Sequence, residues 1–83
     1  MDVGIIGGGG HVGLPMGLVL ADGGYSVNLI DKDADRLDRI ARGDMPFTEE
    51  GSEQILESVL EAGRLSTSTD LSTVADCEVV MIV

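Results

Sequence analysis

Four consecutive glycines, from Gly7 to Gly10, stand between a short apolar run and a stretch with the spacing of a helix. Glycine loses more conformational freedom on folding than any other residue, so such a run is unfavourable unless the backbone requires it. Gly8, Gly10 and Gly13 match the spacing Gly-x-Gly-x-x-Gly. In that motif the first glycine allows a tight turn, the second lets a pyrophosphate approach the backbone, and the third lets a helix pack closely on a strand. The sequence therefore predicts a strand, a glycine turn and a helix that bind a dinucleotide.

The rest of the chain alternates between strand-like and helix-like segments. Short β-branched or alternating runs predict strands, and apolar residues at helical spacing predict helices. The expected strands lie at 3–6, 25–31, 64–70 and 77–83, the last of them buried, and the expected helices at 11–22, at 33–43 and around 55–60, with a single helical turn capped by Asp70. Two ion pairs are expected on the second helix: Asp35 with Arg39 and Asp38 with Arg42.

Strands that alternate with helices form a parallel sheet with right-handed crossovers. We therefore expect an α/β fold of the Rossmann type with strand order 3-2-1-4, truncated after the fourth strand. With 83 residues and an apolar run at 79–83, the chain is expected to be the N-terminal part of a dinucleotide-binding domain. The rest of that domain and a substrate domain would be absent, and an uncovered fourth strand predicts self-association.

Fifteen acidic residues against five basic ones give the chain a net charge of −10. This charge argues against nucleic acid or an anionic membrane as a partner, because both bind clustered lysine and arginine. No signal peptide or membrane-spanning run is visible, so a cytoplasmic protein is expected. Cys77 is the only cysteine, which excludes an internal disulfide and a multi-cysteine metal site, and we interpret it as a packing residue without a catalytic role.

Asp31 ends the expected second strand, 23 positions after Gly8. An acid at this place accepts hydrogen bonds from the adenosine ribose and repels a 2′-phosphate, which favours NAD over NADP. Lys32 and Arg36 can partly neutralise such a phosphate, although solvated charges at a helix start explain them equally well. The expected cofactor-binding residues are Gly8, Gly10, His11, Val12, Gly13, Asp31, Lys32 and Arg36, with no catalytic residue and no metal ligand.

Four stretches together resemble one known family. "GGGGHVGLP", Asp31, "MPFTEEG" and "GRLSTSTD" are similar in order and spacing to the start of the nucleotide-sugar dehydrogenases that act on UDP-glucose, GDP-mannose or UDP-N-acetylmannosamine. Glu50 and Ser52 depart from the proline and leucine that the family often has. The resemblance implies that Asp31 and Lys32 flank the ribose, and that Glu49 lies near the cofactor or a domain interface.

The same resemblance implies an activity for a complete enzyme. Such an enzyme oxidises the primary alcohol of a nucleotide sugar to a carboxylate in two NAD-dependent steps through a thiohemiacetal, with a catalytic cysteine and lysine far downstream. The 83 residues would supply only the adenosine and diphosphate half of the NAD site.

Two other interpretations remain open from the sequence. A non-catalytic nucleotide-sensing domain of the kind that regulates potassium transport has a similar glycine turn and strand end, but it lacks the Leu-Pro and Pro-Phe-Thr-Glu elements. A dehydrogenase of the 3-hydroxyacid or 6-phosphogluconate type is the other alternative.

Overall fold

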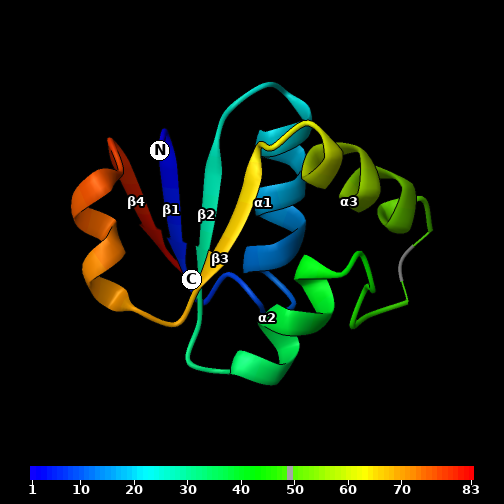
Figure 1. The fold of residues 1–83 in the computed structure, drawn as a ribbon, viewed down its shortest axis with the longest axis horizontal. Coiled ribbons are helices and arrows are strands. Elements are labelled where there is room, and N and C mark those ends of the chain that lie inside the picture. Colours follow the sequence, from blue (N-terminus) through cyan, green and yellow to red (C-terminus); the bar gives the residue numbers. More distant parts are fainter. Residues whose placement is uncertain (49) are drawn as a thin grey trace.

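The computed structural model describes residues 1–48 and 50–83. The elements, in chain order, are β1 (Val3–Ile6), α1 (Gly13–Asp22), β2 (Val27–Ile30), α2 (Ala34–Ala41), α3 (Ser52–Glu61), β3 (Leu65–Ser68), the 3₁₀ helix η1 (Leu71–Asp76) and β4 (Val79–Ile82). The strands form one parallel sheet in the order β3-β2-β1-β4 (Figure 1). The expected α/β fold and strand order are confirmed.

The four strands start in register with one another. Val3 of β1 lies opposite Val27 of β2 and Val79 of β4. Val27 in turn lies opposite Leu65 of β3. Because the strands are parallel and in register, their carboxyl ends share one edge of the sheet, beside the C-terminus in Figure 1. The strand order reverses at β1, and open α/β sheets bind ligands at the carboxyl edge next to such a reversal. The loop after β1 therefore occupies the position where a ligand site is expected.

The core lies on one side of the sheet. Figure 1 shows α1, α2 and α3 on this side and η1 on the other. The largest fully buried side chains are Ile5, Leu14, Val27, Leu29, Ile40, Leu56 and Val59. Gly17 lets α1 lie close to the sheet, because a Cβ at this position would be 2.7 Å from Cδ2 of Leu29. The close packing of α1 on the sheet therefore fixes the position of the start of α1 relative to the end of β1.

The start of α1 differs from the prediction. His11 and Val12 lie in the turn after Gly10, whose N–H donates to the carbonyl oxygen of Gly7 at 3.1 Å, and the first helical residue is Gly13. Val12 already has right-handed helical dihedral angles (φ −98°, ψ −46°), and the N–H of Leu14 donates to the carbonyl oxygen of Gly10. Pro15, however, has no N–H to donate to the carbonyl oxygen of His11, so the regular hydrogen bonds of the helix start later than the apolar spacing. The helix therefore begins two residues later than expected.

β4 is exposed, so the burial that its apolar pattern predicts is wrong for this chain, whereas the uncovered fourth strand that was also expected is present. Val79, Val80 and Ile82 are 54%, 42% and 78% exposed. β1 pairs with one edge of β4, and within residues 1–48 and 50–83 no strand pairs with the other edge. An apolar pattern shows that a strand is suited to burial but does not supply the element that buries it.

A polar network links η1 to the sheet. Asn28, 5% exposed in the middle of β2, donates through Nδ2 to Oγ1 of Thr73 at 3.0 Å. Its Oδ1 accepts from the hydroxyl of Ser66 in β3 at 3.2 Å. Asp70 caps η1 as predicted, because its Oδ1 accepts from the hydroxyl of Ser72 at 2.7 Å and from the N–H of Ser72 at 2.9 Å. These two hydrogen bonds, the hydroxyl first, hold the pKa of Asp70 below its usual value.

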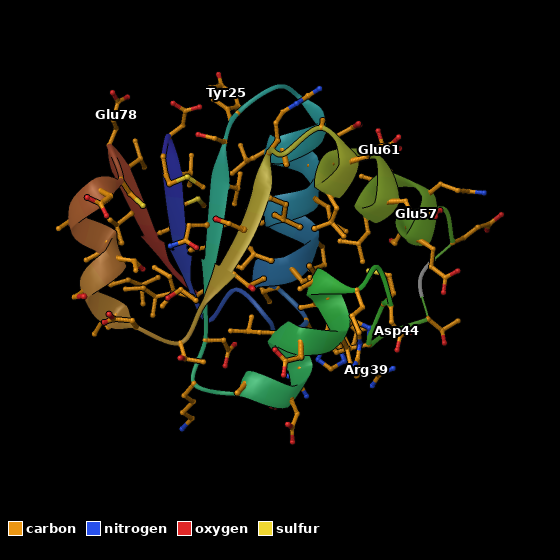
Figure 2. The ribbon with its side chains drawn as sticks, viewed as in Figure 1. Tyr25, Arg39, Asp44, Glu57, Glu61 and Glu78 are labelled. Carbon is orange, nitrogen blue, oxygen red and sulfur yellow. The ribbon has the colours of Figure 1, made fainter. Side chains whose placement is uncertain are left out.

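The surface charges of α2 pair differently from the prediction. The ion pairs Asp35–Arg39 and Asp38–Arg42 are absent from the described residues. Nε of Arg39 lies 3.1 Å from Oδ2 of Asp44, just beyond the end of the helix (Figure 2). The N–H of Asp44 also donates to the carbonyl oxygen of Arg39 at 2.9 Å, so the backbone brings this acid back to the arginine.

Candidate functional site

The first two glycines of the run fold the chain back over the end of β2. Gly7 has φ of +84°, a conformation that strongly favours glycine. The N–H groups of Gly7 and Gly8 both donate to the carbonyl oxygen of Ile30, at 2.8 and 3.1 Å. A Cβ on Gly8 would lie 2.8 Å from both Cα and Cβ of Leu29. Gly7 therefore has the left-handed backbone conformation, and Gly8 allows the loop to pack closely on β2. The motif had predicted instead that Gly8 is the glycine that permits the tight turn.

Gly10 and Gly13 face different surroundings. Among the residues that the structure describes, a Cβ on Gly10 would meet only the carbonyl oxygen of Gly7 within 4 Å, at 3.4 Å. A Cβ on Gly13 would overlap that same carbonyl oxygen and would lie 2.8 Å from Cα of Gly8. Gly13 is thus required by contact between α1 and the loop, and nothing in residues 1–48 and 50–83 explains why position 10 is a glycine.

The start of α1 presents backbone donors without acceptors. Among the described residues, the N–H groups of His11, Val12 and Gly13 make no hydrogen bond, and the next one, that of Leu14, donates to Gly10. The Ncap residue has no side-chain hydrogen bond, and the first turn of α1 has no acid. Free N–H groups and the helix dipole together favour an anion at this place.

Asp31 lies on the other side of the glycine loop. Its Oδ2 accepts from the N–H of Gly9 at 3.0 Å, and its Oδ1 accepts from the N–H of Asp33 at 3.0 Å. Each carboxylate oxygen has a second lone pair, so the side chain can accept further hydrogen bonds. A Cβ on Gly9 would be 3.1 Å from Oδ2 of Asp31, so this position is tighter than the variable place in the motif suggests.

A cavity of about 330 Å³ opens at the carboxyl edge of the sheet. Its wall combines apolar side chains from four segments with the polar end of β2. The lining residues are Ile6, Gly7, Ile30, Asp31, Lys32, Thr69, Leu71 and Val83. A larger hollow of about 600 Å³ lies beside α3, but its walls include Glu50, Glu53 and Glu57, which repel phosphate. The smaller cavity is therefore the better match to a nucleotide.

Three side chains from separate segments meet beside the glycine loop. The exposed ring of His11 stacks on the ring of Phe47, with centroids 3.8 Å apart and planes at 25°. Cζ of Arg36 lies 5.5 Å from the centroid of Phe47. Phe47 was not predicted as a neighbour of the site, and its only signal was its place in the "MPFTEEG" loop. Glu49, expected near the cofactor, lies outside the described residues.

The eight expected cofactor-binding residues are thus close in space but divide into two groups. Gly8, Gly10, His11, Val12 and Gly13 form the glycine loop and the start of α1. Asp31 and Lys32 line the cavity, while Arg36 points over Phe47.

Neither a metal site nor a membrane-spanning helix occurs in the part of the chain that the structure describes. Within residues 1–48 and 50–83, no group of three or more histidine, cysteine, aspartate or glutamate residues is placed to hold a metal ion. No helix there is long and apolar enough to cross a membrane.

Comparison with known proteins agrees with this geometry. Residues 1–83 match the UDP-glucose/GDP-mannose dehydrogenase family, NAD binding domain. The chain is 41% identical over 76 residues to UDP-glucose 6-dehydrogenase from Pseudomonas aeruginosa and 38% identical over 76 residues to that from Rhizobium meliloti, in each case covering 90% of this chain and 17% of the relative.

Two solved structures extend the comparison. GDP-mannose dehydrogenase from Pseudomonas aeruginosa superposes with a TM-score of 0.93 at 33% identity, over 100% of this chain and 19% of that one. A UDP-glucose dehydrogenase from Pyrobaculum islandicum gives 0.90 at 27% identity, over 98% and 19%. This chain spans less than a fifth of the length of these proteins. It belongs to the UDP-glucose/GDP-mannose dehydrogenase family, and its residues 1–83 match the NAD-binding domain of that family.

Proposed function

We propose that this chain binds the diphosphate and adenosine portions of NAD for a nucleotide-sugar dehydrogenase. The observation that carries the proposal is that, among the described residues, a Cβ at Gly10 meets only one atom within 4 Å, and the N–H groups of the next two residues, His11 and Val12, make no hydrogen bond. Those donors and the helix dipole supply the positive potential that a diphosphate needs, in a chain whose net charge is −10. The family match favours this function over a nucleotide-sensing regulator and over the 3-hydroxyacid or 6-phosphogluconate type.

The residues of the glycine loop and the start of α1 would bind the diphosphate. Gly8 and Gly13 hold the loop and α1 against the sheet, which points the N–H groups of His11 and Val12 at the diphosphate. Gly10 leaves the volume that the diphosphate occupies.

The second group of residues would receive the adenosine. Asp31 accepts hydrogen bonds from the ribose hydroxyls, with Lys32 beside it at the cavity wall. Arg36 borders this part of the site. The cavity has room for a flat apolar ring such as adenine, because most of its other lining side chains are apolar.

The whole reaction belongs to a longer enzyme. We propose that this enzyme oxidises the primary alcohol of a nucleotide sugar to a carboxylate, with NAD as the hydride acceptor, in the cytoplasm. The role of residues 1–83 is to bind and orient the cofactor. Cys77 is not assigned to catalysis, because its thiol packs against Gly4 and donates to the carbonyl oxygen of Thr73 at 3.7 Å.

The proposed role of Asp31 can be tested by comparing the affinities of the chain for NADH and NADPH. The chain should bind NADH at least about tenfold more tightly than NADPH, because a hydrogen bond to a charged group contributes about 1.5–3 kcal/mol. Asp31→Asn removes the charge that repels a 2′-phosphate and should reduce this difference. Isothermal titration calorimetry with both cofactors measures it.

Asp35→Asn is the matched control, because it makes the same charge change at an exposed position on α2. It should leave the ratio of the two affinities as in the native chain. Equal affinities for NADH and NADPH in the native chain would contradict the assignment of Asp31.

We also propose that the 83-residue chain self-associates through β4. Its free edge and exposed side chains, with Ile82 at 78%, form the kind of strand that pairs with another copy. Light scattering over a range of concentrations should show dimers or larger species. Ile82→Lys should yield a monomer, and Val19→Lys, at the 69% exposed position on α1, should not. A native chain that is monomeric at every concentration would refute this proposal.

A further inference from the structure

The side chains of Arg36 and Asp31 both approach Gly9 but do not form an ion pair within the described residues. A Cβ built on Gly9 would lie 3.1 Å from Oδ2 of Asp31 and 3.4 Å from Cδ of Arg36, so both side chains cover the same glycine. Yet in the described part of the chain no ion pair joins Arg36 to Asp31. Nε of Arg36 lies instead 3.8 Å from Oδ2 of Asp33, the Ncap residue of α2.

The ion pair with Asp33 is one of two contacts of comparable strength that hold the guanidinium group of Arg36. The side chains of Arg36 and Asp33 are 37% and 46% exposed, and exposed ion pairs contribute about 0–1 kcal/mol. The contact of Arg36 with the face of Phe47 is of comparable strength, about 0.5–1 kcal/mol at an exposed site. Phe47 therefore accounts for about as much of the arginine's position as its acidic partner does.

Phe47 is itself well fixed. It is partly buried against the hydrophobic core, and its ring stacks on His11 at a centroid distance of 3.8 Å. A leucine at this position would keep apolar contact with the core but would present no π face to Arg36. The aromatic ring is therefore the part of Phe47 that acts on the arginine.

We propose that Phe47 is a positioning residue that sets the preference for NAD over NADP by holding Arg36 away from Asp31. This inference rests on the proposed NAD-binding function. With Arg36 held, the charge of Asp31 is not neutralised and its oxygens remain available to ribose hydroxyls. With Arg36 released, its guanidinium is free to pair with a 2′-phosphate and to offset the repulsion from Asp31.

The experiment compares NADH and NADPH dissociation constants, measured by calorimetry on the protein as its gene encodes it. Phe47→Leu should raise the affinity for NADPH relative to NADH about three- to fivefold, the equivalent of losing one cation–π contact. Phe47→Tyr keeps the ring face and should restore the native ratio. In an Arg36→Ala background, Phe47→Leu should leave the ratio unchanged.

The alternative outcomes separate the possible failures. If Phe47→Leu weakens both cofactors equally, or if the ratio shifts in the Arg36→Ala background as well, the inference is overturned. A native chain that fails to bind NADH overturns the proposed function and this inference with it. If the native chain binds NADH but Phe47→Leu leaves the ratio of the NADH and NADPH affinities unchanged, the inference about Phe47 is overturned and the proposed function is not.

Discussion

Replacing Gly10 with valine should abolish measurable NADH binding and leave the fold intact. Gly10 is not among the glycines with positive φ, and a Cβ there meets only the carbonyl oxygen of Gly7, at 3.4 Å. On the proposed function, the isopropyl group would instead occupy the volume that the diphosphate needs beside the N–H groups of His11 and Val12. Losing two charge-assisted hydrogen bonds of about 1.5–3 kcal/mol each weakens binding by at least about a hundredfold.

Calorimetry measures the affinity of the Gly10 variant, and far-ultraviolet circular dichroism with a thermal scan measures its fold. Gly23→Val is the matched control, because Gly23 is exposed at the opposite end of α1 and has φ of −76°. It should bind NADH as the native chain does. A Gly10→Val chain that binds within a few-fold of native affinity would show that no diphosphate occupies this space.

Gly13→Val should instead destabilise the protein, and binding should be lost with the fold. A Cβ on Gly13 overlaps the carbonyl oxygen of Gly7 and lies 2.8 Å from Cα of Gly8 and 2.9 Å from the carbonyl carbon of Gly7. All three are backbone atoms, so relief requires α1 to move away from the loop. Overpacking of this kind costs about 1–3 kcal/mol or more.

For a domain of this size, each kcal/mol corresponds to about 4–8 °C in Tm. The thermal scan should therefore show Tm lowered by about 10 °C or more for Gly13→Val, against little change for Gly10→Val. Equal values of Tm for the two variants would contradict the division of the motif into a binding glycine and a packing glycine.

Local patterns in the sequence were sufficient to predict most of the fold. The β-branched runs and helical spacings placed each strand and helix, and their alternation, together with the Rossmann-type glycine motif, predicted the order β3-β2-β1-β4. These signals are reliable because each depends on the periodicity of one segment. The same holds for Asp70, whose capping of η1 involves only residues two and three positions away.

The features that were missed depend on more than one segment. The spacing of the motif does not say that Gly7 carries the positive φ, because this follows from how the loop meets Ile30 of β2. The stack of Phe47 on His11 joins segments 36 residues apart in sequence. The exposure of β4 depends on what packs against it. Sequence reasoning therefore predicted the individual strands and helices better than the contacts between segments.

The hydrogen bond from Gly9 to Asp31 affects when the loop loses its conformational entropy. Because Oδ2 of Asp31 accepts this N–H at 3.0 Å, the flexible glycine segment is already fastened to the end of β2 in the folded protein. The entropy of ordering the four glycines is then lost on folding and is not subtracted again from the affinity for a ligand. Asp31 is thus both a candidate ligand group and the anchor that preorganises the loop.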